Sequence, residues 1–170
     1  MASKRAAAKL AGAAAEGLMK PLKNIVKEGE ELAETVIRRV DSKGRLIPDG
    51  VQRLPSGRLP ANSRYAGEMY PMDRLPQKLR DKYPDGVRFT DDGFPDFSPY
   101  ADRTVKFEPP GFGGNRGSDF TDANRLAGID ETPDTHTWHH HQDGHTMQLV
   151  PTDLHDAIRH AGGVAIKKGL

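Results

Sequence analysis

The chain has 170 residues, 35% of them hydrophobic, so we expect one compact domain with less compact appendages. It contains no cysteine, which excludes disulfides and thiolate sites and restricts any metal to nitrogen and oxygen ligands. No segment approaches the roughly 20 apolar residues that span a bilayer, and the net charge of +1 lacks the positive excess usual in nucleic-acid binders.

Residues 2–39 are predicted to be helical, with a break at residues 17–21. An Ala-rich run comes first, and a stretch with apolar residues at helical spacing follows. The excess of basic side chains there is explained as well by a solvated helix face as by a nucleic-acid contact, and we favour the solvated face. We therefore interpret residues 1–40 as a helical arm or linker without chemistry.

Residues 41–110 are rich in Gly, Pro, Asp and Arg, a composition that predicts ordered loops. A short helix is expected at residues 77–82, and short strands at residues 87–89 and 104–107. Four aromatic side chains in this region are interpreted as core that holds the loops, and not as platforms for stacking bases: Phe89, Phe94, Phe97 and Tyr100.

The next predicted element is a helix capped by Ser118 or Asp119 and ended by Gly128 in the left-handed conformation. Arg116, Asp119 and Asn124 could position backbone phosphates. An Arg and an Asp at a helix start more often stabilise the fold, and we favour that structural interpretation.

A hairpin and a helix are predicted to end the chain. The strands are expected at residues 136–141 and 146–150, and a helix from residue 153 to 160 is expected to stop at two glycines, residues 162 and 163. All seven histidines fall in this part of the chain. Because imidazole is the commonest metal ligand and titrates near neutral pH, this clustering favours a catalytic metal site.

Neighbouring strand residues face opposite ways, so His139 and His140 are predicted to have different roles. On a regular helix, His160 would lie about 140° around the axis from His155, and it could bind the same ion only if the helix unwinds early. Arg159, one turn after His155, is better placed to hold a phosphate. His136, His141 and His145 are expected to face solvent as bystanders, and Trp138 is expected to anchor the core.

Four short motifs resemble the WHH family of the HNH/endonuclease VII superfamily: TrpHisHis (138–140), MetGlnLeuValPro (147–151), LeuHis (154–155) and HisAlaGlyGly (160–163). Two upstream blocks, residues 82–101 and 118–129, are similar to segments that accompany that domain. The similarity spans roughly residues 64–165. It implies an α+β fold with a C-terminal ββα-metal (HNH-like) finger as nuclease core at residues 111–170, on which the loop-rich residues 41–110 pack.

The resemblance also implies roles for single residues. His139 and His155 would bind the metal, with His160 as a less secure ligand, and His140 would be the general base. The family's middle Asn, which steadies the base, is absent here, and Gln148 is the nearest substitute. Imidazole ligands suit zinc, our first choice, or nickel or cobalt, whereas Mg²⁺ or Mn²⁺ could serve in turnover.

These inferences predict a metal-dependent DNA endonuclease that acts as an interbacterial toxin. The implied partners are DNA, an immunity protein and a delivery component that would bind the N-terminal arm. The chain is expected to be soluble, made in the cytoplasm, exported without a Sec signal and active in the target-cell cytoplasm. The alternatives are an RNase with the same metal site and a non-catalytic zinc module that binds a partner, although a closed zinc site needs four ligands.

Overall fold

The computed structural model describes residues 27–31 and 40–170, and the chain divides into two compact units, Met1–Ile47 and Pro48–Leu170. In the first unit, residues 27–31 are helical, and an isolated antiparallel bridge joins Val40 to Leu46. The rest of the helix predicted at residues 2–39 lies outside the described residues. Within the described ranges, no helix has the length and apolar character needed to cross a membrane.

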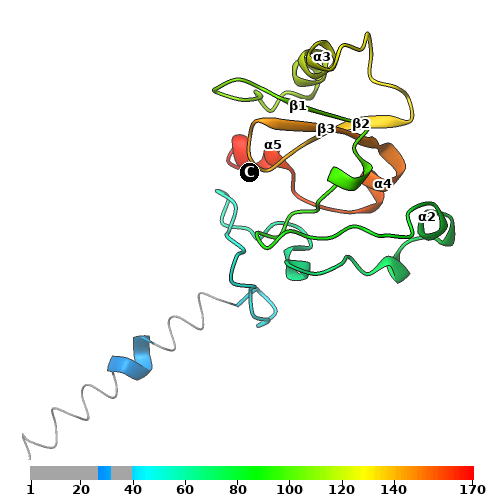
Figure 1. Cartoon of the computed structure of the whole chain (residues 1–170). Helices are drawn as coiled ribbons and strands as arrows, with labels where there is room; N and C mark the ends of the chain where they lie inside the picture. Colours follow the sequence, from blue (N-terminus) through cyan, green and yellow to red (C-terminus); the bar gives the residue numbers. More distant parts are fainter. Residues whose placement is uncertain (1–26, 32–39) are drawn as a thin grey trace, which may run out of the picture. The chain divides into compact units, whose positions relative to one another are not determined.

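The second unit is built on a three-stranded antiparallel sheet with the strand order β1-β3-β2 (Figure 1). The hairpin is confirmed: β2 (His136–His140) pairs with β3 (Thr146–Pro151). Its turn is held by the carboxylate of Asp143, which accepts hydrogen bonds from the backbone N–H groups of His145 and Thr146 at 2.8 Å. The predicted strand at residues 104–107 is present as β1 (Arg103–Lys106), and it pairs with the other edge of β3.

Two helices pack on opposite sides of this sheet, as Figure 1 shows: α3 (Arg116–Ala127) lies against β1 on one side, and α4 (Thr152–Ala157) lies against β2 and β3 on the other. The α3 helix begins three to four residues earlier than predicted. Asn115 is its N-cap and accepts from the N–H groups of residues 117 and 118, so neither Ser118 nor Asp119 caps it. Gly128 ends the helix with a φ of 67°, as predicted.

The end of α4 differs from the prediction. The helix stops at Ala157, and Ile158 takes an extended conformation, so residues 158–160 are not helical. The two glycines then open a further short helix, α5 (Gly163–Lys167), where the sequence predicted only a stop. A side chain at Gly163 would collide with the carbonyl oxygen of His141 and lie 2.7 Å from Phe112. Glycine is therefore needed because the chain passes directly over the end of the hairpin.

The loop-rich stretch contains α2 (Gln77–Lys82), as predicted, and three 3₁₀ helices: η1 (Ser63–Tyr65), η2 (Met72–Arg74) and η3 (Ser98–Tyr100). The strand predicted at residues 87–89 is reduced to two isolated bridges, Met69 with Arg88 and Phe89 with Pro95. From Pro48 onward, this stretch belongs to the same unit as the C-terminal core.

The sheet separates two hydrophobic clusters. On the α3 side, Trp138, Met147 and Leu149 pack with side chains that include Phe112 and Ala123. On the α4 side, the cluster combines β3 and α4 with the upstream loops: Tyr70, Leu75, Tyr83, Val87, Phe89, Phe97, Val150, Leu154 and Ile158. Of the four predicted core aromatics, Phe89, Phe94 and Phe97 are buried, and Tyr100 is partly buried against the α4-side cluster. Since neighbouring positions on β2 face opposite clusters, this strand can present side chains to both sides of the sheet.

Candidate active site

Three histidines converge beside the sheet. His139 comes from β2, His155 from α4, and His160 from the segment three residues beyond the end of α4. One ring nitrogen of each lies within 4.8 Å of the others, and among the described residues this is the group of side chains that could hold a metal ion. The early end of α4 is what brings His160 there, because a regular helix would have carried it away from His155.

Hydrogen bonds fix which nitrogens are available. Nδ1 of His160 lies 2.6 Å from the carbonyl oxygen of Ile158, which can only accept, so Nδ1 carries the proton. A neutral His160 therefore has its lone pair on Nε2, which lies 3.3 Å from Nδ1 of His139. Nδ1 of His155 is held in the same way by the carboxylate of Asp156, at 3.4 Å. Two of the three imidazoles thus direct a free Nε2 lone pair away from the backbone.

Burial keeps the three rings neutral. It lowers the pKa of His139 well below its usual value, and the neighbouring imidazoles of His160 and His155 lower it further. Burial likewise lowers the pKa of His155, and it lowers that of His160 to about 4. All three side chains are consequently unprotonated near neutral pH, which is the form that a metal ligand requires.

The cluster fits a divalent ion. At a metal to nitrogen distance of about 2.0–2.1 Å, two ligand atoms of a tetrahedral ion are about 3.4 Å apart, close to the 3.3 Å between the His139 and His160 nitrogens. Three imidazoles leave one tetrahedral position for water or substrate, as in catalytic sites.

The ring of Phe97 contacts all three imidazoles. Its ring, which is fully buried, contacts those of His139, His155 and His160 at centroid distances of 5.0, 5.7 and 5.3 Å. Phe97 precedes η3, so the loop-rich stretch supplies part of the site. The sequence predicted that this residue belongs to the core, but no sequence pattern indicated that it contacts the histidines.

His140 faces the other side of β2 and pairs with Asp119 of α3. Its Nε2 lies 3.0 Å from Oδ2 of Asp119, and both side chains are buried, with 8% and 4% exposed. The second oxygen of Asp119 accepts the backbone N–H of Gly113 at 3.0 Å. The carboxylate therefore receives the Nε2 proton of His140 and leaves Nδ1 with the lone pair. Burial lowers the pKa of His140 although Asp119 opposes this, so the ring is neutral near pH 7.

His140 is also fixed by aromatic contacts. The ring of Phe112 meets it edge to face at 4.8 Å, and that of Phe120 stacks on it at 5.9 Å. Because packing and the Asp119 contact both restrain the imidazole, its orientation is preorganised before any substrate binds.

One hollow of about 390 Å³ reaches both histidine groups. Its lining includes the three clustered histidines, His140 and two cations, Arg116 and Lys168; it is completed by Gly114, Phe120, Trp138, Gly162 and Val164. The hollow therefore offers neutral imidazoles for metal binding and proton transfer together with positive charge, a combination suited to a negatively charged substrate.

Two predicted site residues lie elsewhere. Arg159, predicted to hold a phosphate, follows α4 with an exposed side chain and does not line the hollow. Gln148, predicted to steady the base, pairs with His139 across the hairpin, and its Oε1 is buried without a partner. The hydrogen bond that orients His140 comes instead from Asp119, which the sequence indicated as a fold-stabilising residue. The one sequence feature that could have indicated this role of Asp119 was its position in the upstream block 118–129.

The remaining histidines stay outside the three-histidine cluster. The sequence predicted that they face solvent, but in the structure they are partly buried. The side chain of His136 is 19% exposed and lies 3.1 Å from the carboxylate of Asp102. His141 is partly buried and lies 3.3 Å from that of Asp143, and His145 is partly buried in the turn. Trp138 is buried in the core as expected, and its Nε1 donates to Asn124 at 2.7 Å.

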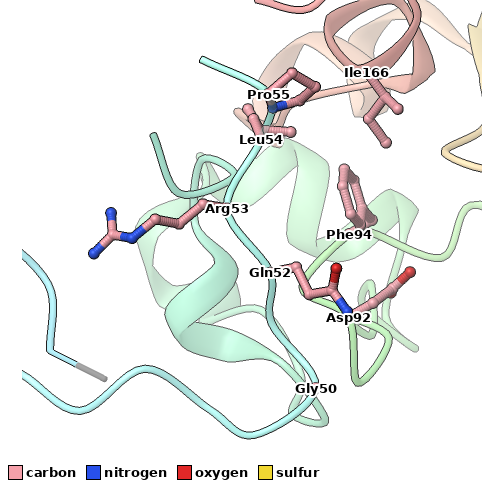
Figure 2. Close-up of a pocket in the computed structure, with 8 residues that line it drawn as sticks. All are labelled: Gly50, Gln52, Arg53, Leu54, Pro55, Asp92, Phe94 and Ile166. Carbon is pink, nitrogen blue, oxygen red and sulfur yellow. The ribbon is translucent and has the colours of Figure 1, made fainter. Parts of the chain in front are cut away.

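A second hollow of about 450 Å³ lies among Gly50, Gln52, Arg53, Leu54, Pro55, Asp92, Phe94 and Ile166. Figure 2 shows the side chain of Arg53 directed away from Phe94 and Ile166. No histidine lines this space, and Asp92 is its only carboxylate. It therefore lacks the ligands and the base that distinguish the hollow beside the sheet.

The segment that carries these histidines is similar to a known protein family. Residues 129–169 match the WHH family, described as a nuclease of the HNH/ENDO VII superfamily with conserved WHH. The matched segment contains the hairpin, α4, α5 and all four site histidines, whereas Asp119, Arg116 and Phe97 precede it. No curated protein matches the chain.

Proposed function

We propose that this chain is an endonuclease that hydrolyses DNA phosphodiester bonds at the hollow beside the sheet, because residues 129–169 match the WHH family of HNH/ENDO VII nucleases. In this proposal, His139, His155 and His160 hold one divalent ion, and His140 is the general base. The convergence of three neutral imidazoles next to a separately oriented fourth one is the observation that carries it.

The general base follows from the tautomer of His140. Its Nδ1 accepts a proton from the attacking water as the water oxygen forms its bond to phosphorus and the bond to the leaving oxygen breaks. Asp119 accepts the Nε2 hydrogen bond throughout and stabilises the imidazolium that forms. A bound divalent ion supplies Lewis-acid stabilisation of the negative charge that develops on the phosphate.

The ligand set favours zinc in the resting protein, since imidazole suits zinc, whereas Mg²⁺ prefers oxygen ligands. Nickel, cobalt, manganese and magnesium are the other candidates in turnover. A purely structural zinc site would need four protein ligands, and the described residues offer three at this position. An open position is the arrangement that catalysis requires.

We further propose that the chain acts as a toxin delivered into the cytoplasm of a competing cell, with an immunity protein that covers the hollow. The support is the resemblance to toxin-associated WHH domains together with the positive charge around the hollow, which an acidic inhibitor could match. In this scheme, residues 1–40 would connect to the export machinery.

The activity is tested with supercoiled plasmid and total RNA, each incubated with chelator-treated protein and then with added Zn²⁺, Mg²⁺ or Mn²⁺. We expect metal-restored nicking of the plasmid and intact RNA. Loss of RNA with an intact plasmid would make the protein an RNase, and loss of neither would favour the non-catalytic zinc module.

The matched control is His136→Ala, which removes a histidine of β2 outside the cluster and should leave nicking unchanged. For the toxin role, we expect expression of the wild-type chain to arrest bacterial growth and His140→Ala to remove the arrest. Growth arrest that persists in His140→Ala would contradict nuclease toxicity.

A further inference from the structure

Two cations line the hollow without a role in the metal cluster. Arg116 begins α3, which precedes the segment matched to the WHH family, and Lys168 follows α5 at the end of that segment. Both side chains are exposed, and both line the hollow that contains His139 and His140. Parts of the chain that lie 52 positions apart therefore bring positive charge to one place.

Arg116 is held in position by two contacts. Its guanidinium donates to the hydroxyl of Thr137 on β2 at 3.2 Å, and it lies over the ring of Phe120 at 5.2 Å. Phe120 stacks in turn on His140. The ring of Phe120 therefore contacts both the guanidinium and the proposed base. Most of the five N–H donors of the guanidinium remain available to a ligand.

The side chain of Lys168 lies close to Gly114, in the loop before α3. A Cβ atom at Gly114 would lie 3.3 Å from Cε of Lys168, so the lysine side chain runs close to this glycine. Gly114 also has a φ of 80°, a conformation that favours glycine. Gly114 and Lys168 both line the hollow.

Neither cation is neutralised by a carboxylate within the described ranges, although several other cations are. Arg45 pairs with Asp41, Lys82 with Asp153, and Arg125 with Asp122. Two uncompensated charges at an open hollow favour an anionic ligand.

We propose that Arg116 and Lys168 bind the nucleic-acid backbone at and next to the scissile phosphate, the role that the sequence assigned to Arg159. This inference rests on the proposed nuclease function and adds its phosphate contacts. Arg116 can hold one phosphate through two parallel N–H groups, whereas Lys168 supplies a point charge. Phosphate contacts of this kind set the position of the substrate without reading its sequence.

Binding is measured apart from cleavage, with the full chain carrying His140→Ala in chelator and a fluorescently labelled DNA duplex as probe. The dissociation constant is determined over a range of salt concentrations. Each phosphate contact removed should lower the slope of log affinity against log salt by about 0.9. We therefore expect a decrease of this size in Arg116→Gln and in Lys168→Gln, and about twice this in the double variant.

The matched control is Arg125→Gln, which removes the same charge from the same helix about 14 Å away. Its slope should stay unchanged, and Arg116→Lys should restore most of the slope lost in Arg116→Gln. Unchanged slopes in both Gln variants would overturn the proposal, as would a decrease in Arg159→Gln in their place. Circular dichroism confirms that each variant is folded.

Failure of this proposal is distinct from failure of the nuclease assignment. Metal-dependent nicking by the wild-type chain with unaltered salt slopes in the variants would refute the phosphate contacts alone. Slopes that fall as expected, without any cleavage by the wild type, would refute the nuclease and leave the anion site in place.

Discussion

Nε2 of His140 lies 3.0 Å from a carboxylate oxygen of Asp119, and the two buried side chains join the hairpin to α3. The other oxygen of Asp119 is occupied by the N–H of Gly113, so the carboxylate cannot rotate freely. This pairing determines the tautomer of His140, and it places a residue from outside the WHH segment at the centre of the site.

The substitution Asp119→Asn should lower kcat by about 100-fold while metal affinity and fold are retained. The amide oxygen of Asn can still accept from Gly113, but its NH₂ group would then face Nε2 of His140. The imidazole would have to accept there and carry its proton on Nδ1, where it could no longer act as a base. Steady-state cleavage kinetics and zinc titration of the same preparation test this, and an unaltered kcat would show that Asp119 has no positioning role.

The two histidine groups should respond differently to substitution. His140→Ala is expected to bind metal like the wild type but to lose cleavage by at least about 100-fold, since it removes the proton acceptor. His155→Ala is expected to lose both, since it removes a ligand. Plasmid nicking and metal content measured on the same samples separate these effects, and an equal loss of metal in both variants would reverse the assigned roles.

Phe97→Ala should destabilise the protein by about 3–5 kcal/mol, because it removes a fully buried ring from the α4-side core. It should also weaken metal binding, because the same ring contacts all three clustered imidazoles. Phe89→Ala is the matched control: Phe89 belongs to the same cluster but makes no ring contact with these histidines. Urea unfolding and zinc titration should show similar losses of stability in the two variants and a loss of affinity specific to Phe97→Ala.

The metal-free protein should become less stable as the pH falls from about 6.5 to about 4. The pKa of His160 is lowered from its usual 6.5 to about 4 in the folded chain, and burial also lowers those of His139 and His155. Between these values the unfolded chain binds protons that the folded chain does not, so acid favours unfolding. Urea midpoints in chelator should decrease over this range, less steeply in His160→Asn; midpoints that rise toward acid would contradict the burial of neutral imidazoles.

Much of the fold could be predicted because its signals are local. The hairpin follows from alternating side chains around a turn with Asp143 and Gly144, and α2 has the predicted bounds. Gly128 likewise ended α3 as predicted. The start of α3 was placed too late, since Asn115, which precedes the two predicted caps, captures the free N–H groups first.

The site was only partly predictable, because its remaining parts depend on contacts between distant segments. The clustering of histidines and the family resemblance indicated His139 and His155 as candidate ligands, but the position of His160 depends on where α4 ends, and Ile158 is already extended. Asp119 and Phe97 reach the histidines across 21 or more positions of sequence, and no local pattern indicates such a contact. The same holds for the position of Lys168 beside Gly114.

The most direct test of the three-histidine metal centre is a calorimetric titration of the metal-free chain with Zn²⁺. We expect one ion per chain, an affinity at least about 100-fold lower in each of His139→Ala, His155→Ala and His160→Ala, and no change in His136→Ala. His160 is the decisive position, because it can reach the other two histidines only if α4 ends before it. A His160→Ala variant that binds zinc as tightly as the wild type would contradict a three-histidine metal centre.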